Sequence, residues 1–342
     1  MSRKHITILG IESSCDDTSA AILCGNKIIA NCVSTQEIHQ KYGGVVPELA
    51  SRAHQEHIVP IVKKALIDAQ IELNDIDAIA FTRGPGLMGS LIVGVSFAKA
   101  LSLAIKKPLI DVNHMKAHVL AHFIEEEGEE GNSTPDFPFL CLTVSGGHTQ
   151  IVEVHGPNDL HVIGSTIDDA AGEAFDKAAK MVGIDYPGGP KLDEFAENGN
   201  PDKFSFAKPR IKNLDFSFSG LKTSILYKIR DLSQGNIDFI RENKIDLCAS
   251  IRKSIVDILI EKLLKAATQR GIKTLAIAGG VSANRELRRR LLALEKDGYK
   301  VYIPKFEYCT DNAAMVAIAG KFAFEVGEFA SQGVTADPRL KW

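Results

Sequence analysis

The sequence lacks the features that mark secreted, membrane and zinc-finger proteins. Its 342 residues include six cysteines, and no two of them form a CxxC pair, so neither a structural zinc knuckle nor a dithiol redox motif is expected. Isolated cysteines in apolar surroundings are typical of a reducing compartment. There is no uninterrupted apolar run of 18 residues and no signal peptide before the first strand-like segment. These absences predict a cytoplasmic protein that does not span a membrane.

The sequence also lacks an excess of basic charge. Its 40 Lys and Arg residues face 43 Asp and Glu residues, so the net charge is −3. No global positive field therefore indicates nucleic-acid binding. A nucleic-acid substrate would need a basic partner or a local patch, for which the candidates are residues 208–212 and Arg288, Arg289 and Arg290.

A weak internal repeat predicts two α/β halves. Each half begins with a strand–turn–strand segment (6–23 and 139–154), followed by a buried strand, a glycine loop and a helix (76–101 and 272–294). A further short strand follows each helix; the first leads to His114 and the second to Asp311. We expect duplicated α/β domains facing one cleft: residues 1–135 joined by a C-terminal helix at about 310–342, and residues 136–309 with a helical insertion at about 167–265.

Glycine-rich turns at strand ends are the candidate ligand-binding loops. The turn Val144-Ser145-Gly146-Gly147-His148 would allow the backbone to approach a ligand, although a plain tight hairpin has the same sequence signature. In the stretch 278–290, two glycines follow an apolar strand, and Ser282 or Asn284 can cap the next helix. That arrangement leaves a helix N-terminus open to an anion or a nucleotide. Neither turn matches the dinucleotide-binding GxGxxG or the P-loop pattern.

An acidic helix is predicted from Asp168 onward. Its residues Asp169, Glu173 and Asp176 follow helical spacing and would share one face. Composition alone favours a solvated acidic face. The glycine-rich turn that follows at 187–190 makes a ligand-lining role the alternative.

His114, His118 and His122 recur at intervals of four residues, which places neighbouring histidines on one helix face. Only an adjacent pair can chelate one ion, and His122, next to Phe123, is assigned to packing. The zinc-protease motif HExxH carries a glutamate as its general base. No glutamate lies between these histidines, so peptide hydrolysis by that mechanism is disfavoured.

Taken together, these motifs resemble the tRNA threonylcarbamoyltransferase family, formerly called O-sialoglycoprotein endopeptidase. The resemblance runs from residue 8 to about 318, and two of its stretches, GGVVPELASR and FSFSGLKT, are similar to the bacterial branch. The other matching stretches are GIESSCDDTSAA, GPGLMGSLIVG, NHMKAH, VSGGHTQ, DDAAGEAFDKAAK, DYPGGP, GGVSANRELR and CTDNAAM.

The resemblance implies an actin-like, sugar-kinase and Hsp70 type of fold, with ribonuclease H-like halves. It implies transfer of a threonylcarbamoyl group from threonylcarbamoyl-adenylate to N6 of adenosine 37 in tRNAs that read ANN codons, which forms t6A and releases AMP. It also implies a divalent metal, Fe(II) or alternatively Zn(II), bound by His114, His118 and Asp311. The implied substrate-binding residues are Val144, Ser145, Gly146, Gly147, His148, Asp176, Gly189, Asp193 and Asn284.

The implied partners are tRNA, a paralogous non-catalytic subunit and a small ATPase. Because Asp311 follows the last strand of the second half, we expect each half to contribute a metal ligand. Two other functions remain as alternatives: a metal-dependent glycoprotease that uses the histidine pair, and a non-catalytic nucleotide-binding regulator.

Overall fold

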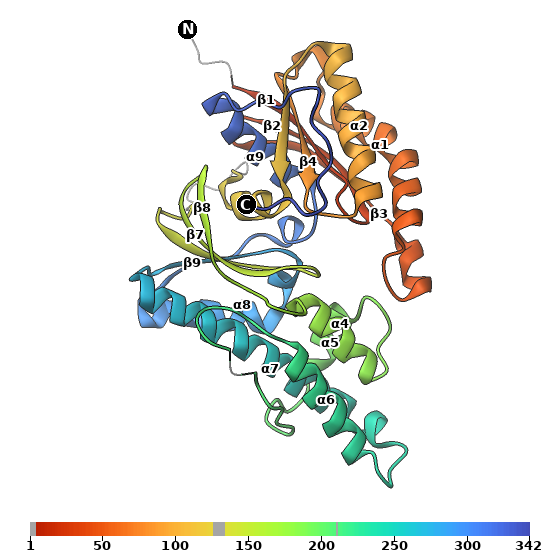
Figure 1. Cartoon of the computed structure of the whole chain (residues 1–342), viewed down its shortest axis with the longest axis vertical. Helices are drawn as coiled ribbons and strands as arrows, with labels where there is room; N and C mark the ends of the chain where they lie inside the picture. Colours follow the sequence, from red (N-terminus) through yellow and green to blue (C-terminus); the bar gives the residue numbers. More distant parts are fainter. Residues whose placement is uncertain (1–4, 126–133, 210) are drawn as a thin grey trace. The chain divides into compact units, whose positions relative to one another are not determined.

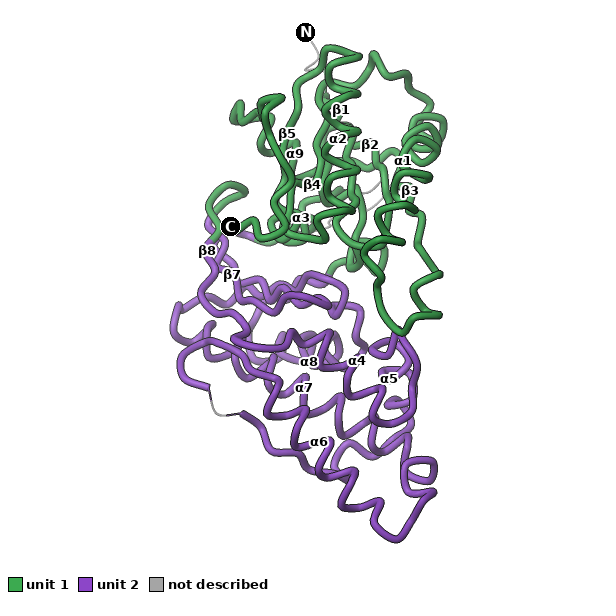
Figure 2. The backbone as a smooth tube through the Cα atoms, turned by 45° about the vertical axis from the view of Figure 1, so that its right-hand side comes forward, with its two compact units in different colours: residues 1–135, 156–160, 304–342 green, residues 136–155, 161–303 purple. Residues whose placement is uncertain are grey.

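The computed structural model describes residues 5–125, 134–209 and 211–342. The chain divides into two compact units (Figure 2). Unit 1 takes its residues from the ranges 1–135, 156–160 and 304–342, and unit 2 from 136–155 and 161–303. The chain therefore leaves unit 1 after residue 135, forms unit 2 except for the short segment 156–160, and returns to unit 1 at Pro304.

Unit 1 is built on a five-stranded mixed sheet (Figure 1). In spatial order its strands are β3 Lys27–Thr35, β2 Asp17–Cys24, β1 Thr7–Glu12, β4 Ala78–Gly84 and β5 Leu109–Asn113. β1 pairs antiparallel with β2 and parallel with β4, and β5 continues the parallel part. The helices of this unit are α1 Pro47–Ala69, α2 Met88–Ile105, α3 His114–Leu120 and α9 Ala313–Val326, with short 3-10 helices η1 Glu37–Tyr42, η2 Leu73–Asp75, η3 Ala121–Phe123 and η6 Phe306–Tyr308.

The central strand β1 is covered on both faces, which explains its continuous run of buried residues. Successive side chains of a strand point to opposite faces. Leu9 and Ile11 belong to the cluster formed with α1 and α2. Gly10, between them, lies against α9 on the other face.

Among the described helices, α2 is long and apolar enough to cross a membrane by length and composition, with a mean hydropathy of 1.8. In the structure α2 packs against α1 and β4. Its residues Leu91, Val95 and Ala98 are buried in unit 1. This packing accounts for only part of the apolar composition of α2, because Met88, Ile92 and Leu103 are exposed.

Unit 2 repeats the same plan. In spatial order its strands are β10 Lys300–Tyr302, β9 Thr274–Ala278, β6 Phe139–Val144, β7 Thr149–Gly156 and β8 Asp159–Ser165. β6 pairs antiparallel with β7 and parallel with β9, just as β1 pairs with β2 and β4 in unit 1. The predicted internal repeat is confirmed. The remaining elements are α4 Ala171–Met181, α5 Gly188–Ala196, α6 Ser219–Leu232, α7 Phe239–Arg270, η4 Gly280–Ala283, α8 Arg285–Ala293 and η5 Leu294–Asp297.

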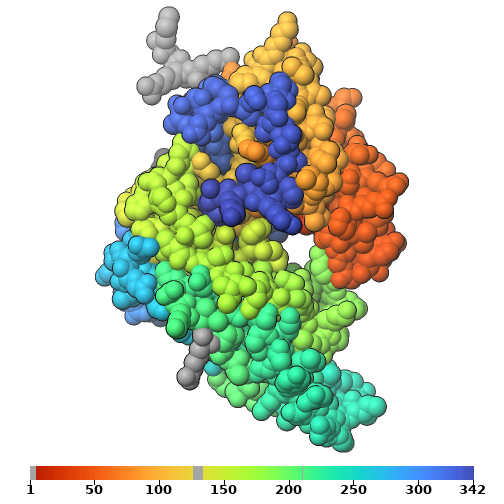
Figure 3. Space-filling view, in the orientation of Figure 1, coloured from red at the N-terminus to blue at the C-terminus, as the bar shows by residue number. Residues whose placement is uncertain are grey.

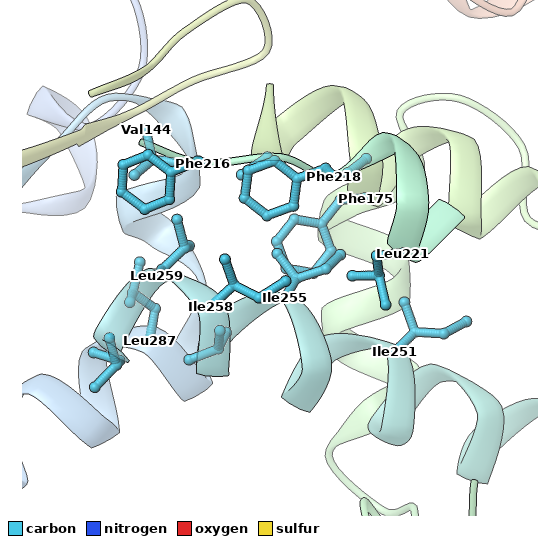
Figure 4. Close-up of a cluster of buried hydrophobic side chains, with 14 of the residues drawn as sticks. Val144, Phe175, Phe216, Phe218, Leu221, Ile251, Ile255, Ile258, Leu259 and Leu287 are labelled. Carbon is cyan, nitrogen blue, oxygen red and sulfur yellow. The ribbon is translucent and has the colours of Figure 1, made fainter. Parts of the chain in front are cut away.

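The long helix α7 forms the floor of the unit 2 core (Figure 4). Ile251, Ile255 and Leu259 recur at helical spacing and are fully buried. They pack in one cluster with Phe216 and Phe218, whose rings are stacked 6.4 Å apart. This apolar support fixes α7 beneath α4, α5 and α8, the helices that carry the predicted nucleotide-binding residues.

The acidic helix begins later than the sequence predicts. α4 starts at Ala171, so Asp168 and Asp169 precede it. Asp169 instead pairs with Lys177 and Lys222. The prediction that Asp169 shares a helix face with Glu173 and Asp176 is wrong, because lysine partners and not helical geometry set its position.

The C-terminal segment after α9, residues 327–342, has little regular structure and lies along unit 1. Figure 3 shows it in dark blue, and it is called the strap below. Lys99 donates to the carbonyl oxygen of Val334 at 2.9 Å, and Arg83 donates to that of Thr335 at 3.2 Å. Asn113 Nδ2 donates to the carbonyl oxygen of Lys341 at 3.1 Å. The strap is therefore tied to the strand end that precedes α3.

Candidate metal centre and nucleotide-binding loops

The two histidines of the candidate centre stand at the start of α3, directly after β5. Asn113 is the N-cap, and its Oδ1 accepts from the backbone N–H groups of Met115 at 2.9 Å and Lys116 at 3.2 Å. His114 is therefore the first helical residue and His118 lies one turn later. Both imidazoles are buried.

Asp311 reaches the same place from the segment before α9. Asn312 caps α9 by accepting from the N–H of Met315 at 3.0 Å. A Cβ atom on Gly10 of β1 would lie 2.3 Å from the carbonyl oxygen of Ala313, so only glycine lets the start of α9 pack this closely on the sheet. All three residues belong to unit 1. The expectation that each half contributes a ligand is wrong, because the chain returns to unit 1 before it reaches Asp311.

His114, His118 and Asp311 form a compact cluster, in which one potential ligand atom from each residue lies within 4.8 Å of the others. Asp311 Oδ1 is 3.4 Å from His114 Nε2 and 3.3 Å from His118 Nε2. The two imidazole rings are 4.7 Å apart and nearly perpendicular. His122 lies in η3 and is not part of this cluster.

Glu12 supports the cluster from the end of β1. Its carboxylate is fully buried, and its Oε2 lies 3.1 Å from His114 Nδ1. The same oxygen accepts from Thr82 Oγ1 at 2.6 Å, and Oε1 accepts from the N–H of Ser14. A carboxylate on Nδ1 holds the proton there and leaves Nε2 free to face Asp311. No local sequence pattern signals this contact, because Glu12 and His114 lie 102 residues apart.

The charged groups of the cluster shift one another's pKa values. Burial alone would raise the pKa of Asp311, but the two imidazoles hold that pKa well below its usual range. For His114, burial opposes the charged form, yet Asp311 and Glu12 raise its pKa above the ordinary value. For His118, burial dominates and lowers the pKa. Acidic and basic groups thus lie together in one buried cluster, in which the carboxylates would balance the charge of a bound cation.

The donor set fits a divalent metal ion. Two imidazoles and one carboxylate form a common ligand set for Fe(II) and Zn(II), and they leave coordination positions open. Both ring nitrogens of His118 are buried and have no well-formed hydrogen bond among the described residues. Buried polar atoms are nearly always satisfied, so this orphaned ring indicates a missing ligand.

In unit 2, the turn Val144–His148 joins β6 to β7. It is closed by a hydrogen bond of 2.8 Å from the N–H of Ser145 to the carbonyl oxygen of His148, and by one of 3.1 Å from the N–H of His148 to Ser145 Oγ. Cβ atoms on Gly146 and Gly147 would meet nothing within 4 Å. The fold itself therefore does not require glycine at these two positions, and the space beside their backbone is open.

Asp176 and Gly189 meet at the start of α5. Asp176 Oδ1 accepts from the N–H groups of Gly188 and Gly189, each at 2.9 Å. Burial raises the pKa of Asp176, and these two hydrogen bonds oppose that rise. The aspartate thus anchors the glycine-rich turn to α4.

Asn284 and Asp193 also meet. Asn284 caps α8, since its Oδ1 accepts from the N–H of Leu287 at 3.0 Å, and its Nδ2 donates to Asp193 Oδ1 at 2.9 Å. Of the two caps that the sequence left open, Ser282 and Asn284, the structure uses Asn284. The buried Asp193 also accepts from Arg252, a residue that sequence reasoning did not single out because it sits in an ordinary helical pattern.

The candidate basic patches are largely neutralised within the chain. Lys208 and Arg290 both pair with Asp257, and Arg289 pairs with Glu286. Arg210 lies outside the described residues. A cavity of about 540 Å³ opens beside these groups, between the C-terminal end of α5, the middle of α7 and the first turns of α8. It is lined by none of the predicted adenylate-binding residues.

The two matching sheets place the chain in the actin-like α/β class. Two crystal structures share this fold at low sequence identity. Component A of (R)-2-hydroxyglutaryl-CoA dehydratase from Acidaminococcus fermentans is 18% identical, with a TM-score of 0.53 over 93% of this chain and 99% of that chain. Full-length HypF is 13% identical, with a TM-score of 0.62 over 96% of this chain and 48% of that chain. The predicted fold class is confirmed.

The chain belongs to the tRNA N6-adenosine threonylcarbamoyltransferase family, whose model matches residues 27–318. Proteins of that name are 56% identical in Christiangramia forsetii, over 100% of both chains, and 57% identical in Riemerella anatipestifer, over 99% of this chain and 98% of that protein. The one in Thermosipho africanus is 47% identical over 98% and 99%. The resemblance stated from the motifs is confirmed, and the protein is a transferase that forms t6A in tRNA.

Proposed function

We propose that this enzyme takes the threonylcarbamoyl group from threonylcarbamoyl-adenylate, transfers it to N6 of adenosine 37 in tRNAs that read ANN codons, and releases AMP. The observation that carries the proposal is the buried cluster of two imidazoles and one carboxylate with an orphaned histidine, in a chain of this family. Neither a glycoprotease nor a non-catalytic regulator has such support, since the cluster has no general-base glutamate between its histidines and a regulator has no need of the cluster.

His114, His118 and Asp311 would hold one divalent metal, for which Fe(II) is the first choice and Zn(II) the alternative. A bound metal with open positions polarises an acceptor carbonyl. The carbamoyl–phosphate anhydride is already activated, so no covalent nucleophile is needed, but the exocyclic amine of adenine is a poor nucleophile and must be positioned. Glu12 would keep Nδ1 of His114 protonated and its Nε2 available.

The adenylate would be bound by unit 2. The open backbone at Gly146 and Gly147 suits the close approach of a phosphate or carbamoyl group. Asn284 at the start of α8 and Asp176 of α4, which contacts the start of α5, are the polar groups next to glycine-rich turns. The expected contacts are those of Val144–His148, Asp176, Gly189, Asp193 and Asn284. Because Asp193 already accepts three hydrogen bonds, from Asn284, Arg252 and the N–H of Arg285, its role with the ribose would be added to a structural one.

The chain would work in the cytoplasm with partners. Its net charge is −3 and several of its candidate tRNA-binding lysines and arginines are paired internally. A paralogous non-catalytic subunit and a small ATPase, as the resemblance implies, would supply the rest of the assembly.

The function is tested by incubating the metal-loaded protein with labelled threonylcarbamoyl-adenylate and unmodified tRNA, with and without the partner proteins. We expect label in tRNA at N6 of adenosine 37, and tRNAs that lack this adenosine serve as the control. Absence of label in tRNA with all partners present would refute the proposal.

The metal site is tested by metal analysis of three alanine variants. His114→Ala and Asp311→Ala should lose the metal, because each leaves only two protein ligands. His122→Ala is the matched control and should retain it. Full occupancy in Asp311→Ala would contradict the proposed ligand set.

A further inference from the structure

Arg252 is a buried arginine in the middle of α7 that the proposed chemistry does not use. The residue is 7% exposed, and its guanidinium donates to the end of α5. Nη1 donates to the carbonyl oxygen of Asp193 at 3.0 Å and to its Oδ1 at 2.8 Å, and also to the carboxylate of Glu197. Nη2 donates to the carbonyl oxygen of Ala196 at 3.1 Å. A cation here is favoured by the helix C-terminus as well as by the two carboxylates.

Asp193 links Arg252 to α8 through further hydrogen bonds. Its Oδ1, which accepts from Arg252, also accepts from Asn284 Nδ2 at 2.9 Å. Its Oδ2 accepts from the N–H of Arg285 at 3.2 Å. The chain of hydrogen bonds therefore runs from α7 through α5 to the first residues of α8, and it ends on the asparagine that caps α8.

We propose that Arg252 is a positioning residue of the nucleotide site, which holds Asp193 and thereby fixes the Asn284 side chain in the orientation that receives the adenylate. This inference rests on the proposed function, in which Asn284 contacts the nucleotide. An amide nitrogen has two hydrogens. The bond to Asp193 uses one of them and so determines where the other points.

The electrostatic reason is the burial of Asp193. The residue is 6% exposed, and its carboxylate makes its one salt bridge among the described residues with Arg252. Removing one partner of a buried ion pair leaves an uncompensated charge. Without the guanidinium, the carboxylate of Asp193 would turn toward water, and this change would release Asn284.

The probe is AMP, the expected product, titrated by calorimetry into metal-loaded protein. Arg252→Met keeps the apolar stem of the side chain and removes the charge. We expect AMP to bind about tenfold more weakly, the loss that corresponds to one hydrogen bond, while metal content stays unchanged. In transfer assays the KM for the adenylate should rise more than kcat falls. Lys253→Met is the matched control: it removes a positive charge one residue away, where Lys253 pairs only with the exposed Asp202 among the described residues, and should bind AMP as the unaltered protein does.

A double-mutant cycle separates positioning from general support of the fold. If Arg252 acts through Asn284, Arg252→Met should have no further effect on AMP affinity in an Asn284→Ala background. Additive losses, or unchanged affinity in Arg252→Met, would overturn the inference. If Arg252→Met does not fold, Arg252→Gln, which also removes the charge but keeps a polar side chain, decides the question in the same cycle by the same criterion. If Asn284→Ala alone leaves AMP binding unchanged, the proposed nucleotide contact of Asn284 fails, and the positioning role of Arg252, which acts through that contact, fails with it.

Discussion

Replacing Glu12 by glutamine should switch the proton of a metal ligand from one ring nitrogen to the other. The backbone N–H of Ser14 can only donate, so the amide oxygen of the introduced glutamine will remain at the position of Oε1. The NH₂ group then takes the place of Oε2, which lies 3.1 Å from His114 Nδ1. That nitrogen would then accept from the amide and from Ser14 Oγ, which lies 3.2 Å away, so the proton moves to Nε2, the atom that faces Asp311.

The size of the effect follows from the lost contact. A hydrogen bond to a charged group contributes about 1.5–3 kcal/mol, and loss of such a carboxylate partner typically weakens metal binding by about 10- to 100-fold. We therefore expect the Kd for metal in Glu12→Gln to rise by about 10- to 100-fold.

The assay is competition with a calibrated chelator, using protein whose fold is verified by circular dichroism. Thr82→Val is the control, because Thr82 donates to Glu12 but is not part of the ligand cluster, and it should change the Kd by only a few-fold. A Kd for Glu12→Gln within about twofold of the unaltered protein would refute the reasoning.

Three further predictions concern other parts of the chain. Gly10→Ala would place a Cβ atom 2.3 Å from the carbonyl oxygen of Ala313, so α9 must shift. The free energy of unfolding should fall by about 1–3 kcal/mol in unfolding titrations, and metal affinity should fall although no ligand is altered. Unchanged metal affinity would contradict the placement of Asp311 by this contact. Burial raises the pKa of Asp17 to about 7 from its ordinary 3.8, so the folded state holds a proton that the unfolded chain releases, and stability falls as pH rises from about 4 to 7. Asp17→Asn should remove this decline, so that by about pH 8 its free energy of unfolding exceeds that of the unaltered protein by at most about 4 kcal/mol. The measurement is urea unfolding of both chelator-treated proteins as a function of pH, and parallel profiles would contradict the prediction. Binding of tRNA should be weak for the isolated chain and should fall steeply with salt, so tight, salt-insensitive binding in a filter assay would exclude the proposed dependence on local basic groups.

Much of the fold is predictable because the internal repeat consists of local sequence patterns for strands, glycine loops and helices. Strand, glycine loop and helix recur with the same spacing in both halves, and the structure builds β1, β4 and α2 from one copy and β6, β9 and α8 from the other. The histidine pair and the cap at Asn284 are equally local signals. Such features depend on residues a few positions apart, which helix and strand periodicity report directly.

The supporting contacts are not predictable in this way. Glu12 and His114 are 102 residues apart, and Arg252 and Asp193 are 59 apart. Each pair meets only after sheets and helices have packed. The unit to which Asp311 belongs depends on where the chain crosses back, and strand order alone does not reveal that crossing. The position of Asp169 is mispredicted for the same reason, because its ion pair with Lys222, 53 residues away, is not visible in local helical spacing.

The return of the chain to unit 1 has a consequence for the order of events during synthesis. His114 and His118 leave the ribosome well before Asp311, since the whole of unit 2 is translated between them. A nascent or truncated chain that ends before Asp311 offers the two imidazoles but not the Asp311 carboxylate, and its central strand lacks the helix that packs against Gly10. Two imidazoles alone under-coordinate a divalent ion. Stable metal uptake would therefore wait for a completed polypeptide, so that incorporation of the ion marks molecules whose synthesis and folding have finished.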